Sequence, residues 1–307
     1  MAAPEVMASF HPPPGSPITP LEPGSPRAPR DIVPAPIVGQ QSVHQTTFAC
    51  IEAAVASSCG RQHDINEDAH SDLMGGRGRL FVLADGVGGG AMAQMASRQL
   101  VAQLHAAFDT HRPDADRVRA ALLDADRAIA RRIAETTDSP GAATVALCAP
   151  LNAFASKWLV AWVGDCRVYR LVVGGEARIE LLTRDDTFGN LGELPPDRGS
   201  PDDPARMVGN GAISLANVAL HQLAYGDLFV LCSDGVHKYV DVDDWGRLLK
   251  QPLPLLRRCE NLIALARANG SADDATVLLL RRGAASNPRL RWLKRWVESI
   301  DSPRANR

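Results

Sequence analysis

Six short apolar runs, bounded by turn residues, constrain the fold of this chain more than any other feature of its sequence. The runs are rich in aliphatic, β-branched and aromatic residues, and this composition in short segments is typical of β-strands. The predicted strands cover residues 49–57, 80–84, 157–163, 167–173, 227–232 and 276–281. A chain with this many short strands must bury them in one or more sheets.

Three longer stretches repeat apolar residues with helical spacing, at residues 100–108, 114–133 and 256–266, and we expect these stripes to pack against the core. Strands and helices do not alternate one for one, and residues 163–166 join two of the runs through a short turn. This arrangement predicts antiparallel hairpins and an α+β sandwich rather than a doubly wound sheet. Residues 188–211 lack periodicity and are rich in Gly, Pro and Asp, so we expect a mobile surface flap there.

The two ends of the chain differ in composition from its body, which predicts an arm at residues 1–45, a domain at 46–283 and a tail at 284–307. The arm is rich in proline and is expected to be disordered, although a proline-motif ligand is an alternative. In the tail, residues 288–300 place apolar side chains on one helical face with Arg and Lys nearby. Such a helix could bind an anionic membrane or a partner, and the alternative is that it packs on its own domain.

Charge and cysteine usage exclude several classes of function. The net charge is −2, but residues 281–307 carry eight Lys/Arg against two acids, so the rest of the chain carries −8. An acidic body argues against nucleic acid as a ligand, because the phosphate backbone requires a basic face. The six cysteines form no Cys-x-x-Cys pair, and no apolar run is long enough for a transmembrane helix. We therefore expect a cytoplasmic protein with reduced thiols.

Acidic residues stand where the predicted strands begin or end. They are Glu67, Asp68, Asp85, Asp165, Asp234 and Asp273. A single Asp-Gly pair at a strand end is a common turn, and this is the simplest interpretation of any one of these positions. Carboxylates that gathered together without Lys or Arg would repel one another, however. Hard cations such as Mg²⁺ or Mn²⁺ prefer oxygen ligands and remove that repulsion.

Six segments of the chain form an ordered set of landmarks, among them FVLADGVGG at residues 81–89 and GDLFVLCSDG at residues 226–235. The others lie at residues 60–69, 164–169, 182–185 and 273–277. Through these landmarks, from residue 49 to residue 282, the chain resembles the metal-dependent protein phosphatases of bacterial type, the PPM or type 2C family. The resemblance implies a four-layer α-β-β-α sandwich of two packed antiparallel sheets flanked by helices, in agreement with the pattern of runs.

The resemblance also implies a centre of two Mn²⁺ or Mg²⁺ ions. Asp85 matches the carboxylate that bridges both ions. Asp234 and Asp273 match the remaining ligands of one ion, and Glu67 with the backbone carbonyl of Gly86 matches those of the other. In this family a hydroxide held between the ions attacks the phosphate in line.

Two further carboxylates match lesser roles in the family. Asp68 lies beside the centre and is expected to contact an ion through a water. Asp165 matches a residue that helps to hold a weaker third ion in bacterial relatives. The alternative for Asp165 is that it occupies a hairpin turn, which needs no metal.

Two positions depart from the family pattern. His63 stands where the family usually carries a phosphate-binding Arg, five residues before Asp68. We expect Arg61, with or without His63, to bind the phosphate, since the two would share a face if the segment is extended. The alternative is that His63 is only tolerated near the site. Val87 stands where eukaryotic relatives carry a His, and bacterial relatives commonly have an apolar residue there.

The function implied by the resemblance is hydrolysis of phosphoserine and phosphothreonine in proteins. We expect phosphorylated proteins and a bacterial Ser/Thr kinase as partners, no nucleic acid, membrane contact only through the tail, and a monomer. One alternative is a pseudophosphatase that serves as a binding module, which would require broken metal ligands. Another is a hydrolase of a small phosphorylated molecule, with specificity set around residues 188–211.

Overall fold

The computed structural model describes residues 35–285, except residues 77, 138, 175–177, 212 and 214. Most of the expected arm and tail, including residues 288–300, lies outside the described residues. The arm prediction is wrong for residues 38–45, because these form β1 (Val38–Gln45), a strand that pairs antiparallel with β2 (Ala49–Ser58) along its whole length. Polar residues dominate β1 and its side chains are exposed or half-buried, so its sequence contains no apolar run.

Two antiparallel sheets form the centre of the domain. The first has six strands in the order β1, β2, β11 (Ala275–Ala284), β10 (Leu228–Cys232), β7 (Arg167–Val172) and β8 (Arg178–Leu181). The second has five strands in the order β3 (Ala69–His70), β4 (Phe81–Val87), β5 (Ala142–Pro150), β6 (Lys157–Val163) and β9 (Asn217–Gln222). All six predicted strands are therefore present, with ends that differ by a few residues.

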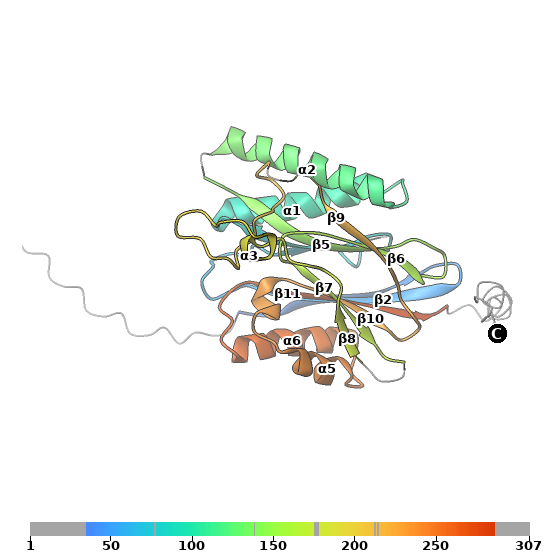
Figure 1. The fold of residues 1–307 in the computed structure, drawn as a ribbon. Coiled ribbons are helices and arrows are strands. Elements are labelled where there is room, and N and C mark those ends of the chain that lie inside the picture. Colours follow the sequence, from blue (N-terminus) through green and yellow to red (C-terminus); the bar gives the residue numbers. More distant parts are fainter. Residues whose placement is uncertain are drawn as a thin grey trace, which may run out of the picture. The chain divides into compact units, whose positions relative to one another are not determined.

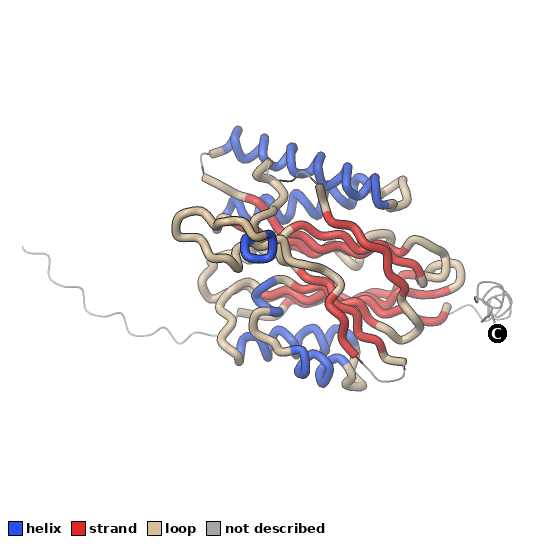
Figure 2. Tube along the Cα trace, viewed as in Figure 1, coloured by secondary structure: helices blue, strands red, loops and turns tan. Residues whose placement is uncertain are grey.

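Helices cover the outer face of each sheet (Figures 1 and 2). On the five-stranded sheet lie α1 (Gly90–Ala107) and α2 (Ala115–Thr136), and on the six-stranded sheet lie α5 (Val242–Leu249) and α6 (Leu255–Ala268). The order of layers is helix, sheet, sheet, helix, so the predicted four-layer sandwich is confirmed. The predicted start of α2 is also confirmed, because the Asp114 side chain accepts a hydrogen bond of 2.9 Å from the Arg117 N–H.

Both faces of the central strands, such as β4, β5 and β10, are buried, which explains why these strands are continuous apolar runs rather than alternating ones. In β4, Phe81 and Leu83 point into the core between the sheets, whereas Val82 and Ala84 pack under α1 and α2. Trp158 fills the centre of the inter-sheet core, with its ring 5.4 Å from that of Phe229. The two sheets and their helices are thus held together by three apolar cores.

The hairpin predicted at residues 163–166 is wrong. The strand before it, β6, pairs with β5 and β9, whereas the strand after it, β7, pairs with β10 and β8 in the other sheet. The chain crosses between sheets through Gly164, whose φ of 91° is one that L side chains rarely adopt. Short turns look alike in sequence whether the flanking strands pair or separate, and here the crossing places Asp165 between the two sheets.

Residues 188–211 are largely irregular, as the sequence predicts, and contain one short helix, α3 (Phe188–Leu191). The Gly189 N–H donates to the Pro201 carbonyl at 2.7 Å, and the Ala205 N–H donates to the Asp186 carbonyl at 2.7 Å. These bonds close the segment into a loop. Its mobility stays a prediction.

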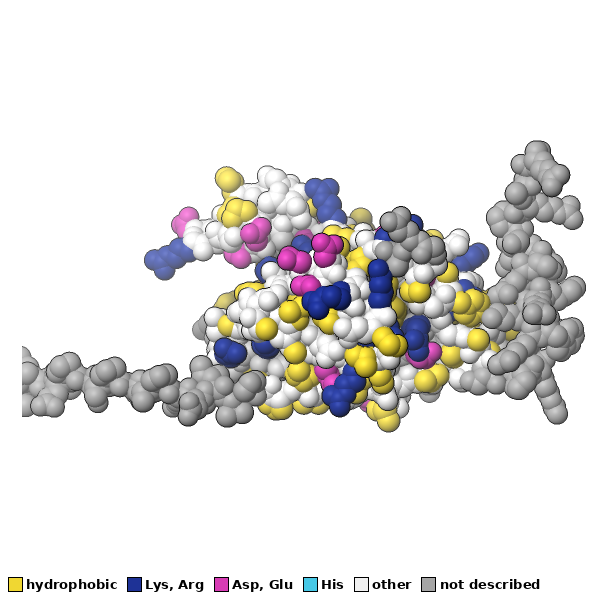
Figure 3. All heavy atoms as spheres, turned by 90° about the horizontal axis from the view of Figure 1, so that it is seen from below, with side chains coloured by type: hydrophobic (Ala, Val, Ile, Leu, Met, Phe, Trp, Pro, Cys, Tyr) yellow, Lys and Arg dark blue, Asp and Glu magenta, His cyan; other side chains and the backbone are white. Residues whose placement is uncertain are grey.

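The outer surface is mixed in charge on the face shown in Figure 3. There, Lys and Arg side chains of the described residues lie among Asp and Glu side chains, without a large area of one sign. No helix in the described part of the chain combines the length and the apolar character needed to cross a membrane.

Candidate metal centre

The predicted acidic residues meet at one junction of the two sheets. Asp85 lies within β4, and Glu67 and Asp68 directly precede β3, so these three come from the five-stranded sheet. From the six-stranded sheet come Asp234, which begins the short helix α4 (Asp234–His237) after β10, and Asp273, which precedes β11. Asp165 lies in the crossing between the sheets.

Electrostatics shows how close these carboxylates are. Burial raises the pKa of Asp85 well above its ordinary value, and the negative charges of four neighbours raise it further. The four neighbours are Asp68, Asp234, Asp165 and Asp273. Against the effect of burial, the interaction with the Asp85 carboxylate is in turn one of the causes that lower the pKa of Asp234. The structure therefore brings five of the six predicted carboxylates together around Asp85.

Two of these carboxylates are strongly disfavoured as anions in the absence of a cation. Burial raises the pKa of Asp68 to about 8, and the charge of Asp274 adds to this, although Thr276 and the hydroxyl of Ser233, which donates to Oδ2 at 2.8 Å, lower it. The other oxygen, Oδ1, is buried without a hydrogen-bond partner among the described residues. Burial and the charge of Asp234 raise the pKa of Asp165 to about 7. Buried carboxylates with an unsatisfied oxygen fit hard divalent cations.

The glycine after each central Asp is required by packing. A Cβ at Gly86 would lie 2.5 Å from the Ala93 carbonyl oxygen and 2.9 Å from that of Glu67. Since Gly86 is part of β4, the simple turn interpretation of Asp85-Gly86 is wrong. A Cβ at Gly235 would lie 1.9 Å from the Asp274 carbonyl oxygen, so glycine lets α4 approach the start of β11.

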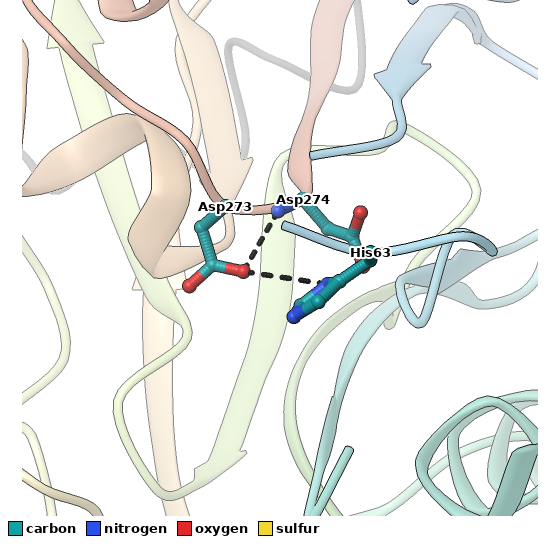
Figure 4. Close-up of side chains that lie close together, drawn as sticks. All are labelled: His63, Asp273 and Asp274. Carbon is teal, nitrogen blue, oxygen red and sulfur yellow. Dashed lines mark hydrogen bonds and ion pairs between the residues drawn. The ribbon is translucent and has the colours of Figure 1, made fainter. Parts of the chain in front are cut away.

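Glu67 is held in place by Asp274, a residue to which the sequence pattern assigns no role. The buried Asp274 carboxylate accepts hydrogen bonds from the backbone N–H groups of Glu67 at 2.7 Å and Gly60 at 2.6 Å. It also accepts one from His63 Nδ1 at 3.0 Å, and Figure 4 shows the imidazole lying beside Asp273 and Asp274. The Glu67 side chain in turn accepts a hydrogen bond from the Gly90 N–H at the start of α1.

The group formed by His63, Asp273 and Asp274 could itself hold an ion, because one ligand atom of each lies within 4.8 Å of the others (Figure 4). The three hydrogen bonds of Asp274 give a simpler account, in which this group braces the segment before β3. Burial alone would lower the pKa of His63, but its hydrogen bond to Asp274 and the nearby negative charges outweigh that effect and raise it.

The extended segment that would place Arg61 and His63 on one face is absent. Arg61 and Gln62 form a turn, and the Gln62 N–H donates to the Ala272 carbonyl at 3.3 Å. Arg61 is exposed and makes no hydrogen bond or ion pair with the described residues. The side chain of His63, by contrast, is engaged through Nδ1. Of the two residues, Arg61 has the freer cationic group.

A cavity of about 310 Å³ adjoins the centre on the side of Asp165. Its lining includes Asp165, Arg167, Asp185, Thr187, Asn190 and Lys238. Arg167 is already paired with Asp185, whose Oδ2 lies 2.7 Å from the Arg167 Nη2. Thr187 is the N-cap of α3 and Asn190 lies within this helix, so the first residues of the loop at 188–211 border the cavity.

Known proteins with related sequences are bacterial phosphatases. The chain is 31% identical over 212 residues to the serine/threonine protein phosphatase PstP of Mycobacterium tuberculosis, a match that covers 66% of this chain. The match covers 40% of PstP, so the chain spans about two fifths of the length of that curated relative. The chain is also 24% identical over 243 residues to the protein phosphatase PhpP of Streptococcus pneumoniae, covering 75% of this chain and 97% of PhpP. No family model matches the chain.

Solved structures give the same result. The catalytic domain of the phosphatase PstP in complex with two manganese ions superposes with a TM-score of 0.65 at 25% identity, over 77% of this chain and 100% of that one. PppA of Pseudomonas aeruginosa has a TM-score of 0.64 at 24% identity, over 77% and 99%, and shows the fold alone. The PPM Ser-Thr phosphatase MsPP of Mycobacterium smegmatis has a TM-score of 0.62 at 24% identity, over 77% and 99%, and likewise shows the fold alone. The homologues and structural neighbours of the chain are thus bacterial PPM-type Ser/Thr phosphatases.

Proposed function

We propose that this protein is a metal-dependent phosphatase that removes phosphate from phosphoserine and phosphothreonine side chains of proteins. The observation that carries the proposal is the convergence of buried carboxylates from both sheets around Asp85. The printed activities of the PstP and PhpP relatives support the same reaction. The pseudophosphatase alternative would require broken ligands, yet the acidic side chain is retained at every predicted ligand position.

The roles proposed for the ligands are those that the resemblance implies, and the positions of the residues in the fold support them. Asp85 would hold one ion together with Asp234 and Asp273, and it would also contribute to the other. Glu67 and the Gly86 carbonyl would complete the other. Two bound divalent ions supply a nucleophilic hydroxide near neutral pH and neutralise phosphate oxygens.

Two further residues of the site, Asp274 and Ser233, hold acidic residues in position through hydrogen bonds. Asp274 fixes the backbone of Glu67, and Ser233 orients Asp68 through its hydroxyl. Asp68 would meet an ion through a water, since its Oδ1 has no partner in the described part of the chain. Val87 has no titratable group, so no side chain at that position protonates the leaving oxygen.

The experiment that tests the function is hydrolysis of a phosphothreonine peptide in Mn²⁺, in EDTA, and by Asp85→Asn. We expect turnover in Mn²⁺ alone and loss of activity to near background in EDTA and in the variant. Asp116→Asn is the matched control, because Asp116 lies on α2 with a side chain 96% exposed. Metal-independent turnover, or no turnover under any condition, would contradict the proposal.

Arg61 is the residue that we propose binds the substrate phosphate. Its guanidinium is exposed and unpaired among the described residues, whereas His63 Nδ1 is held by Asp274. A charge-assisted hydrogen bond contributes about 1.5–3 kcal/mol, so Arg61→Ala should raise KM by roughly 10-fold or more. Arg61→Lys should recover part of the loss, since Lys keeps the charge but loses the bidentate geometry. Unchanged KM and kcat in Arg61→Ala would exclude this role.

The loop at residues 188–211 would determine the class of substrate, because the first residues of this loop line the cavity beside Asp165. Comparing kcat/KM for phosphothreonine peptides with that for small phosphate esters separates the protein phosphatase from a small-molecule hydrolase. We further propose a Ser/Thr kinase and its targets as partners and a monomeric, cytoplasmic protein. All six cysteines are free, which fits a reducing compartment.

A further inference from the structure

Lys238 places an ammonium group between two of the acidic residues of the site. Its Nζ lies 2.7 Å from Oδ2 of Asp234 and 3.7 Å from Oδ2 of Asp165. The Asp165 side chain is only 5% exposed, whereas that of Lys238 is 41% exposed. The lysine therefore reaches inward from the surface and ends between two carboxylates that belong to different parts of the fold.

Local structure fixes Lys238 in this position. It caps α4 one turn after Asp234, and its backbone N–H donates to the Asp234 carbonyl at 3.1 Å. The preceding residue, His237, donates from Nε2 to the backbone carbonyl of Asp165 at 3.0 Å. The turn of α4 thus aligns the backbone of Asp165 and the ammonium of Lys238 at the same time.

No other cation of the described residues takes this role. Arg167 is the other basic side chain that lines the adjoining cavity, and it is committed to Asp185 by three hydrogen bonds. The positive charge of Lys238 counters the unfavourable burial of both carboxylates. Lys238 is therefore the positive counter-charge that Asp165 and Asp234 share.

We propose that the ammonium of Lys238 is the resident cation of the Asp165–Asp234 pair and excludes a third divalent ion from this place. A third divalent ion between these carboxylates would compete with the ammonium for Oδ2 of Asp234, and the positive charge of Lys238 would repel it. The inference rests on the proposed function, since it concerns the same centre. It assigns Lys238 as a positioning residue and limits the centre to two ions.

The test is Mn²⁺ titration of the metal-free full-length chain by calorimetry, with ions counted by native mass spectrometry. We expect two ions in the wild type and a third, weaker ion in Lys238→Met, which keeps the length of the side chain without its charge. The third ion should disappear again in Lys238→Met/Asp165→Asn and should be absent in Lys238→Arg. Lys250→Met is the matched control, because Lys250 is an exposed lysine at the end of α5.

Two results would overturn this inference without contradicting the proposed function, because in both of them the first two ions still bind. One is a third ion in the wild type that Asp165→Asn removes, and the other is a folded Lys238→Met variant that still binds two ions. If Lys238→Met does not fold, Asp165→Asn in the wild-type background decides, because it should leave the count at two. Absence of any Mn²⁺ binding to the wild type would instead overturn the proposed function, and this inference with it.

Discussion

Asp274 shows how a residue outside the ligand set can control the centre. One buried carboxylate satisfies two backbone N–H groups and an imidazole, and one of those N–H groups belongs to the proposed ligand Glu67. A charge-assisted bond of this kind is stronger than a neutral one, and both N–H groups are buried. The position of Glu67 therefore depends on a side chain more than 200 residues away in the sequence.

Replacement of Asp274 should separate this structural role from direct metal binding. Asp274→Ala leaves two buried N–H groups unpaired and should lower the free energy of unfolding by about 2–4 kcal/mol. Asp274→Asn keeps one acceptor oxygen and should lose clearly less. Urea denaturation in EDTA measures both, since no ion contributes under that condition. Equal stability of the alanine variant and the wild type would show that Asp274 does not brace this segment.

Among the secondary-structure elements, the packing of α1 against β4 positions the carboxylate centre. Gly86 lies where the strand, the first turns of α1 and the backbone of Glu67 come closest. No side chain fits there without moving backbone atoms. The helix, the strand and the ligand segment must therefore shift together or not at all.

Gly86→Ala should consequently destabilise the fold and weaken metal binding in the same variant. Overpacking of this kind typically reduces the free energy of unfolding by about 1–3 kcal/mol. Gly174→Ala is the matched control, since a Cβ there meets nothing within 4 Å and its φ is not positive. Thermal unfolding and Mn²⁺ titration are the two measurements. A Gly86→Ala variant that binds Mn²⁺ as the wild type does would refute the packing argument.

Many of the helices and strands can be predicted from the sequence, and those that cannot be predicted are missed for physical reasons. Runs buried on both faces, such as β4 and β10, are visible because every position is apolar. The edge strands β1 and β9 are not, because part of each faces solvent and their pairing comes from backbone hydrogen bonds. The run of β5 is apolar enough to be found, but its many alanines weaken the strand signal.

The site divides in the same way. The proposed ligands next to strands could be predicted, because acidic residues that recur beside several buried runs indicate a shared site rather than separate turns. The roles of Asp274 and Lys238 could not, because each depends on contacts between segments distant in sequence or on the turn of α4. The crossing at Gly164 could not be predicted either, since pairing partners are set by the packing of whole sheets.

At the scale of the whole molecule, the carboxylate centre makes stability depend on both metal and pH. Without ions, the pKa values of Asp165 and Asp68 rise to about 7 and about 8. Between an unfolded value near 4 and these folded values, the native state binds more protons than the unfolded state. The free energy of unfolding must therefore fall as pH rises through that window.

Metal-free protein should thus lose about 1–2 kcal/mol of stability per pH unit between pH 6.5 and 8. Buried histidines with a lowered pKa, such as His70 and His237, make the free energy of unfolding rise with pH instead. They do so mainly below this window. Urea denaturation in EDTA and in Mn²⁺ measures the effect. Asp165→Asn should reduce the slope below pH 7, and Mn²⁺ should abolish it. A stability that rises with pH in EDTA would contradict the assignment.

The division of the ligands between the two sheets also fixes the order in which this molecule can be assembled. Glu67 and Asp85 come with one sheet, and Asp234 and Asp273 come with the other. Neither sheet alone holds the set proposed for both ions. The ion proposed to bind Asp85, Asp234 and Asp273 needs ligands from both sheets, so a newly made chain acquires its two-ion chemistry only after the sandwich has closed.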